Sequence, residues 1–109
     1  MANSAFCFVQ SNTRPFFAVQ MLRSNDHSVV DLSSATVTFY FRHTDNRVAE
    51  VNGGNCNITD APNGKVEYRW LTGDLNTPGL HIAEFRITFG DGTIQSVIIE
   101  DVNVAEKLG

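Results

Sequence analysis

The sequence predicts an all-β protein, an immunoglobulin-like antiparallel β-sandwich of about seven strands. Apolar and polar residues alternate with a period of two, which is the pattern of strands with one buried face. Turn-forming residues separate these segments at roughly the spacing of about 8–12 residues that sandwiches show. No window has the apolar spacing of an amphipathic helix. With 109 residues, the chain is expected to form one domain over residues 1–109.

Residues 35–42 carry the first clear alternation. Val37, Phe39 and Phe41 share one side of the predicted strand, and polar residues occupy the other side. The pattern recurs at residues 65–70, where the apolar side chains alternate with charged ones. We therefore expect two strands, each with one side in the core and one in solvent.

The strongest local prediction is a hairpin near the C-terminus. Residues 80–89 alternate over the longest stretch in the chain and end at Gly90-Asp91-Gly92. Asp-Gly supplies the positive φ angles of a tight turn. Residues 93–99 are then expected to return as the partner strand.

Weaker patterns predict strands at residues 16–23 and 48–51 and a short polar strand at 55–59. Residues 71–78 are expected to form a connecting turn. Residues 1–9 are either a further strand or an N-terminal docking arm. Turns are predicted at residues 24–26, 31–34, 52–54 and 62–64.

Charge disfavours two classes of partner. The formal net charge is −4, and the eight basic residues are dispersed singly rather than clustered. Phosphate recognition needs clustered Lys and Arg, so nucleic acid is not expected as a partner. No basic amphipathic stretch indicates a membrane surface, and the start of the chain lacks the pattern of a signal peptide. We therefore expect synthesis in the cytoplasm of a host cell.

The residues that could carry chemistry do not converge in the sequence. His27, His43 and His81 lie in different segments, and His43 is interpreted as a solvated turn residue. His81 and Glu84 fall on opposite faces of one predicted strand, so they are not expected to form a dyad. These observations predict that the chain is not an enzyme.

Cofactors and metals are not expected either. The glycine-rich turns at 52–54 and 90–92 precede no helix that could hold a phosphate, so both are interpreted as hairpin glycines. No His or Cys spacing matches a zinc site, and the turn aspartates lack the spacing of a calcium loop. Cys7 and Cys56 are interpreted as two small thiols, and a bridge between them stays an open alternative.

Six residues are candidates for contacts with another protein, with core packing as the alternative for the aromatic ones. Adjacent aromatic residues in a strand must face opposite sides, so one of Phe16 and Phe17 is expected to be incompletely buried. The run of residues 97–99 interrupts the alternation, as a strand covered on both faces would, either by this domain or by a neighbouring subunit. The candidates are Phe6, Phe8, Phe16, Phe17, Tyr40 and Ile98.

The order of five segments resembles the small domain at the N-terminus of baseplate upper proteins of tailed phages. The resemblance spans about residues 10–104, and it departs from the family's pattern at His81, where the family usually has tyrosine. The segments are residues 10–15 (QSNTRP), 30–39 (VDLSSATVTF), 64–70 (GKVEYRW), 78–85 (PGLHIAEF) and 89–93 (FGDGT).

The resemblance implies a structural role in a virion, without catalytic residues. Because the chain is one domain long, we favour a multi-copy or homo-oligomeric capsid decoration or cement protein that binds neighbouring capsid subunits. The alternatives are a tail or baseplate adaptor and a carbohydrate-binding adhesion module, for which Tyr40 is the candidate platform. The first hypothesis expects that removing residues 1–9 weakens attachment to the capsid without unfolding the sandwich.

Overall fold

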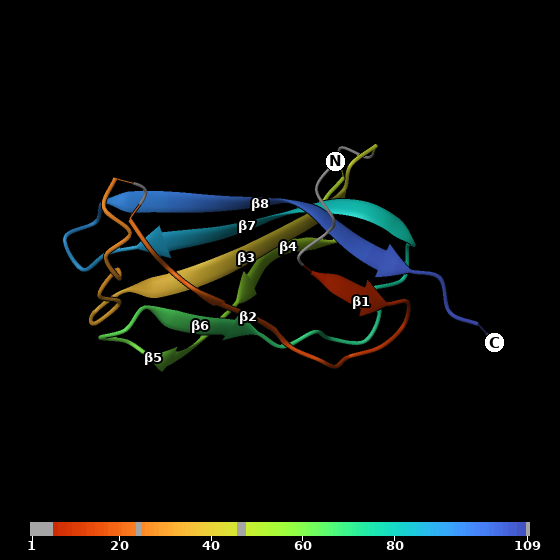
Figure 1. The fold of residues 1–109 in the computed structure, drawn as a ribbon, viewed down its shortest axis with the longest axis horizontal. Coiled ribbons are helices and arrows are strands. Elements are labelled where there is room, and N and C mark those ends of the chain that lie inside the picture. The colour runs from red at the N-terminus through yellow and green to blue at the C-terminus, as the bar shows by residue number, and fades with distance from the viewer. Residues whose placement is uncertain (1–5, 24, 46–47, 109) are drawn as a thin grey trace.

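Two sheets make up the architecture of the computed structural model, which describes residues 6–23, 25–45 and 48–108 (Figure 1). The described part contains no helix, and so none that is long and apolar enough to cross a membrane. One sheet has five strands in the order β1-β8-β7-β3-β4, and the other has three in the order β2-β6-β5. The strands are β1 (Cys7–Val9), β2 (Phe17–Gln20), β3 (Thr36–His43), β4 (Val51–Asn55), β5 (Asn57–Asp60), β6 (Lys65–Tyr68), β7 (Gly79–Thr88) and β8 (Ile94–Ala105).

The predicted all-β class is confirmed, and the two sheets are consistent with a β-sandwich. Eight strands are described rather than about seven. The predicted C-terminal hairpin is present, because β7 and β8 pair antiparallel on either side of the turn. In that turn, Asp91 accepts hydrogen bonds from the backbone N–H of Thr93 at 3.0 Å and from its hydroxyl at 2.6 Å. The carboxylate thereby holds the turn closed.

The strand β8 is longer than predicted and contains a bulge. Ala83 of β7 pairs with Ile99, and His81 pairs with Val102, so β8 has one residue more than β7 in this interval. Asp101 takes up the extra length with a φ of 59°. An extra residue shifts the pleat by one, which exchanges the two faces of the strand beyond it.

The exchange of faces is visible in the burial of β8. Before the bulge, Val97 and Ile99 pack against the core, and Ile98 is 63% exposed on the outer face. After the bulge, the inward residues are Val102 and Val104, both buried. Within the described residues, therefore, the run of residues 97–99 is covered on one face only, and cover of its outer face by a neighbouring subunit stays a prediction.

The strand β1 corrects the expectation that all strands pair antiparallel. It runs parallel to the end of β8, with Cys7 opposite Asn103 and Val9 opposite Ala105. The two strands come from opposite ends of the sequence. No short loop joins them, so the chain imposes no antiparallel direction on the pair.

The turn predicted at residues 52–54 is wrong, because these residues lie inside β4. Phe39 pairs with Gly54 and Tyr40 with Asn52, so Gly53 is the extra residue of a bulge and has a φ of 84°. A Cβ on Gly54 would lie 2.6 Å from Cε1 of Tyr68, so a larger residue would displace that ring. The glycines allow a bulge and a close approach rather than a hairpin turn.

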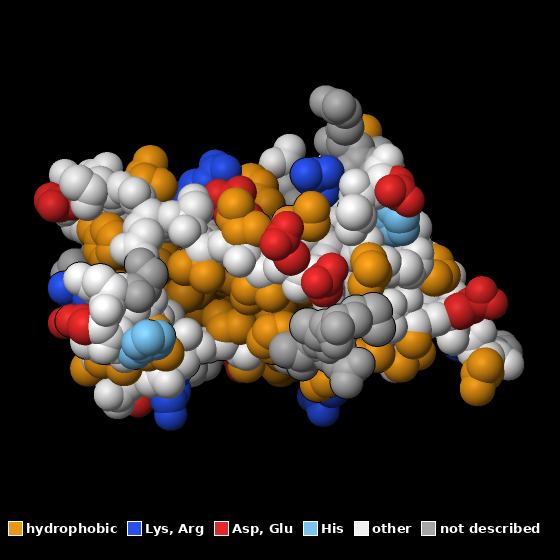
Figure 2. All heavy atoms as spheres, turned by 45° about the horizontal axis from the view of Figure 1, so that its top comes forward, with side chains coloured by type: hydrophobic (Ala, Val, Ile, Leu, Met, Phe, Trp, Pro, Cys, Tyr) orange, Lys and Arg blue, Asp and Glu red, His pale blue; other side chains and the backbone are white. Residues whose placement is uncertain are grey.

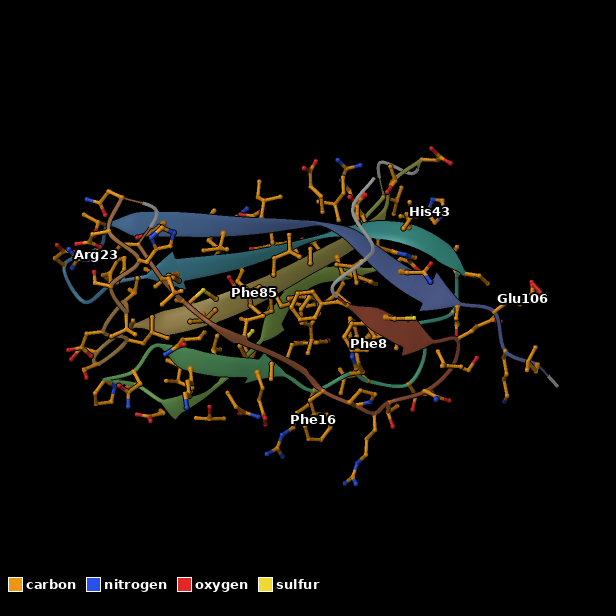
Figure 3. The ribbon with its side chains drawn as sticks, in the orientation of Figure 1. Phe8, Phe16, Arg23, His43, Phe85 and Glu106 are labelled. Atoms are coloured by element: carbon orange, nitrogen blue, oxygen red, sulfur yellow. The ribbon has the colours of Figure 1, made fainter. Side chains whose placement is uncertain are left out.

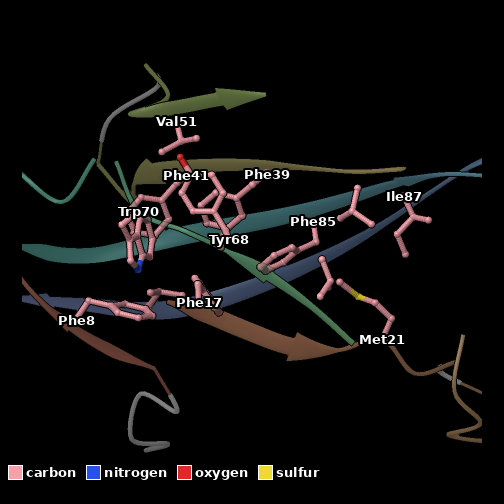
Figure 4. Packing of buried hydrophobic residues seen from close by; sticks show 14 of the residues in the cluster. Phe8, Phe17, Met21, Phe39, Phe41, Val51, Tyr68, Trp70, Phe85 and Ile87 are labelled. Atoms are coloured by element: carbon pink, nitrogen blue, oxygen red, sulfur yellow. The ribbon is translucent and has the colours of Figure 1, made fainter. Parts of the chain in front are cut away.

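Aromatic rings fill the space between the sheets (Figure 4). Phe39 is fully buried and lies at their centre. Offset and edge-on pairs of aromatic rings add to the stabilisation that comes from burying their surface. The indole Nε1 of Trp70 is buried without a hydrogen-bond partner in the described part of the structure. Ring centroids lie 4.3–5.8 Å from that of Phe39 for Phe17, Phe41, Tyr68, Trp70 and Phe85.

We expect Phe39→Ala to lower the free energy of unfolding by about 3–5 kcal/mol, because it removes the ring that both sheets contact. Urea denaturation followed by tryptophan fluorescence measures the change. Ile98→Ala is the matched control, since this side chain is mostly exposed and its loss should change stability by less than about 1 kcal/mol. Equal effects of the two substitutions would contradict the assignment of Phe39 to the centre of the core.

Candidate functional site

The N-terminal aromatic residues proposed for docking lie mainly in the core. Phe8 and Phe17 are 3% and 0% exposed, and the half-buried ring of Phe6 lies 4.7 Å from that of Phe17. Figure 3 shows Phe8 and Phe85 directed into the space between the sheets. Phe8 and Phe17 therefore pack in the core, whereas part of the Phe6 ring stays exposed.

The expectation that residues 1–9 can be removed without unfolding is also affected. Residues 1–5 lie outside the described residues. Residues 7–9, however, form β1, and Phe8 packs its ring 5.0 Å from Trp70. Removing this segment would delete part of the core, so the deletion cannot serve as a test of docking.

Phe16 points away from the core, as one of two adjacent aromatic residues must (Figure 3). Its ring is half-buried, and the guanidinium carbons of Arg14 and Arg69 lie 5.6 and 5.1 Å from the ring centroid. These are cation–π contacts made by exposed side chains. Phe16 thus lies apart from the outer face of the larger sheet, where Tyr40 and Ile98 lie.

That outer face brings together the last two candidates, Tyr40 and Ile98. They come from β3 and β8, and each lies opposite Glu84 of the intervening strand β7. A hollow of about 260 Å³ opens beside them. We call its lining the outer-face patch: Tyr40, Phe41, Arg42, Ala49, Ile82, Glu84 and Ile98.

Polar contacts fix the positions of side chains in and beside this patch. Arg86 places its guanidinium carbon 4.2 Å from the ring centroid of Tyr40 and donates from Nη1 to the Tyr40 hydroxyl at 3.1 Å. Glu84 accepts hydrogen bonds from Nε of Arg86 at 3.0 Å and from the hydroxyl of Ser96 at 2.7 Å. Residues from three strands are thus held in one arrangement before any partner binds.

The same contacts shift the titration of Glu84. The Ser96 hydroxyl, followed by the Arg86 guanidinium, stabilises the ionised carboxylate and holds the pKa of Glu84 below its usual value. The pKa of Glu84 is lower in the folded protein than its usual value. This network therefore stabilises the fold at pH values above the usual pKa of glutamate. That stabilisation is lost as the pH falls through the lowered value.

Sequence reasoning missed a pair formed by the buried His81 and the half-buried Glu50. His81 is 0% exposed, with Nδ1 3.0 Å from the carbonyl oxygen of Gly79 and Nε2 2.5 Å from Oε1 of Glu50. Both partners are oxygen acceptors, so either both ring nitrogens carry a proton or the carboxyl group supplies the second one. The period-two pattern does place His81 on the inward side with Ala83 and Phe85, but nothing in it identifies Glu50.

His43 is also placed differently from the prediction. It is the last residue of β3 and is half-buried rather than solvated, with its ring 5.1 Å from that of His81 and edge-on to it. The ring of Phe41 stacks on the other side of His81 at 4.5 Å. The histidines therefore belong to the packing between β3 and β7, and the buried ring of His81 has no surface for a substrate to contact.

No cluster of three or more His, Cys, Asp or Glu side chains in the described part of the chain is placed to hold a metal ion. The alternative of a disulfide is not present, because Cys7 and Cys56 are both free thiols. Burial raises the pKa of the Cys56 thiol to about 12.

Comparison of the sequence with protein-family models gives no match, and comparison with curated proteins gives none either. The outer-face patch therefore has to be interpreted from its own geometry.

We expect Ser96→Ala to raise the pKa of Glu84 toward the usual range of glutamate, because it removes the hydrogen bond with the largest effect. NMR titration of the side-chain carboxyl carbon measures this directly. Thr36→Ala, on an exposed position of β3, should leave the pKa unchanged. An unchanged value in the Ser96 variant would show that the hydroxyl does not hold the carboxylate.

We expect His81→Phe to lower the free energy of unfolding by about 1–3 kcal/mol, since it leaves the Glu50 carboxylate and the Gly79 carbonyl without their donor. The new ring can still stack on Phe41. Glu50→Gln replaces the carboxylate by an amide that can donate to Nε2, and it should cost less. A larger loss for the Glu50 variant than for the His81 variant in urea denaturation would contradict this account of the pair.

Proposed function

We propose that this chain is a non-enzymatic structural protein that binds other proteins through the outer-face patch. The observation that carries the proposal is the cluster of Tyr40, Arg86 and Glu84 beside the exposed side chain of Ile98. Tyrosine and arginine are the residues most often found at the energetic centre of protein interfaces. The hollow beside them gives an apolar partner side chain a place to insert.

The covering of Tyr40 favours a protein partner over a sugar. Arg86 lies over one face of the Tyr40 ring, so this face is not free to stack on a carbohydrate. The outward side chains of β7 and β8 also mix apolar and charged residues, as the surface of a protein interface does. The adhesion module is therefore the less favoured alternative.

We further propose that the partner belongs to a tailed-phage particle. The support is the order of five sequence segments similar to the N-terminal domain of baseplate upper proteins, together with two sheets that suit an immunoglobulin-like sandwich. A capsid decoration or cement protein present in many copies is the favoured role. A tail or baseplate adaptor is the second candidate.

The direct test is mass spectrometry of purified particles of the phage that encodes this chain, after heads and tails have been separated. Recovery with heads, at a simple ratio to the major capsid protein, is the result expected for a decoration protein. Recovery with tails in few copies would replace this role by that of an adaptor. Absence from both fractions would contradict a virion role altogether.

We expect Tyr40→Ala to weaken binding to the particle by about 30-fold, the effect of losing a residue worth about 2 kcal/mol. Quantitative pull-down of variant protein on particles that lack the wild-type chain measures this change. Thr36→Ala lies on the same strand outside the patch and should bind like the wild type. Equal binding by the Tyr40 variant would show that the patch is not the docking surface.

A further inference from the structure

The first half of β8 is an open edge of the larger sheet. On one side, Ile94–Ile99 pair with β7. On the other side, β1 reaches only Asn103–Ala105, and no other described strand pairs with residues 94–100. An unpaired strand edge offers its backbone N–H and C=O groups to another strand.

The hairpin turn shows which backbone groups face this edge. The N–H of Phe89 donates to the carbonyl of Thr93 at 2.9 Å, so these two residues form a hydrogen-bonded pair of the antiparallel ladder. Such pairs alternate with non-hydrogen-bonded ones along the strand. Residues 95, 97 and 99 therefore bond to β7, whereas the N–H and C=O groups of Ile94, Ser96 and Ile98 point to the open edge.

The edge lacks most of the features that prevent strands from associating. Ile94–Ile99 contain no charged residue, glycine or proline; Glu100, the last residue of the edge, carries its one charge, and the bulge begins only after Ile99. Ile94 and Ile98 are 64% and 63% exposed. Natural edge strands are usually protected by a charge, a proline or a bulge within the edge itself.

A hydrophobic strip accompanies the edge. Val97 and Ile99 of β8 and Val19 of β2 are only partly buried against the core. In Figure 2, where the side of the molecule that carries β8 is brought forward, hydrophobic side chains line a hollowed strip beside this strand. A strand added to β8 would cover part of it.

We propose that a second copy of this chain occupies the edge, with residues 94–100 of the two copies pairing antiparallel about a twofold axis. Such a pair is self-complementary and closes as a dimer. It would join two five-stranded sheets into one continuous sheet. The inference deepens the proposed function, because it names a second copy as one of the binding partners. It rests on the proposed function only in treating this chain as a multi-copy protein.

The length of the edge selects one register, and the charges on the outer face do not oppose it. If all of residues 94–100 pair, the axis passes through the midpoint, Val97, and Ser96 faces Ile98 of the second copy. Because Arg86 lies opposite Ser96 and Glu84 lies opposite Ile98, each Glu84 then shares a row with the second copy's Arg86. An axis through Ser96 would align the two Arg86 side chains, and an axis through Ile98 would align the two Glu84 side chains. Only the Val97 register sets opposite charges in one row, and three strand spacings, roughly 14 Å, separate them.

Sedimentation velocity of the purified full chain in about 0.15 M salt tests the proposal, with a dimer expected as the concentration rises. Ile98→Pro removes a backbone N–H at the open edge without breaking a bond to β7. We expect it to weaken dimerisation at least about tenfold. Ile98→Thr keeps the N–H and is the matched control, expected to dimerise like the wild type. A monomer at all concentrations would overturn the proposal, as would equal behaviour of the two variants.

A cross-linking measurement keeps the test valid if the proline variant fails to fold. In a Cys7→Ser background, Val97→Cys places two thiols on the axis at a separation that allows a disulfide. Gln95→Cys, which would face residue 99 of the second copy, should not cross-link. Rapid cross-linking at position 97 alone supports the register, and equal or no cross-linking at both positions overturns it. These results do not depend on the particle fractions or on Tyr40, so this inference and the proposed function can fail separately.

Discussion

The pleat of β8, interrupted once at Asp101, is the constraint on which the two surfaces of this protein depend. Side chains alternate strictly along a strand, so one extra residue decides which of them enter the core. Before the bulge, Ile98 lies on the outer face of the sheet, beside Glu84 of β7 and in line with Tyr40 of β3. After it, Val102 and Val104 point inward and β1 can pair along the same strand. The bulge thus separates an open half of β8 from a covered half.

The aromatic core explains how the outer face can be a defined surface. Phe39 and Phe85 occupy the inner side of β3 and β7 and contact each other and Phe17. Close packing of large rings leaves these strands little freedom to shift. Tyr40, Glu84 and Arg86 alternate with the buried residues along the same strands and are held at fixed spacings. A surface held in this way loses little conformational entropy when a partner binds.

Period and turn chemistry predicted the fold class, β3 and the C-terminal hairpin, because these features depend on neighbouring residues alone. The position of Gly53 in a strand could not be found in this way, since the bulge shows only in the pairing of β4 with the distant strand β3. The pair of His81 and Glu50 joins residues 31 apart, and β1 pairs with the far end of the sequence. Of the candidate contact residues, strand register brings Tyr40 and Ile98 together on the outer face, whereas Phe8 and Phe17 pack in the core.

Amide hydrogen exchange along β8, followed by NMR at low and high protein concentration, tests this account most directly. In dilute solution, Gln95, Val97 and Ile99 should exchange slowly, whereas Ile94, Ser96 and Ile98 should exchange fast, because only the first three amides bond to β7. At high concentration the second set should become slow as well. Uniform protection of all six amides at both concentrations would contradict an open edge. Alternating protection that never changes with concentration would contradict its occupation by a second copy.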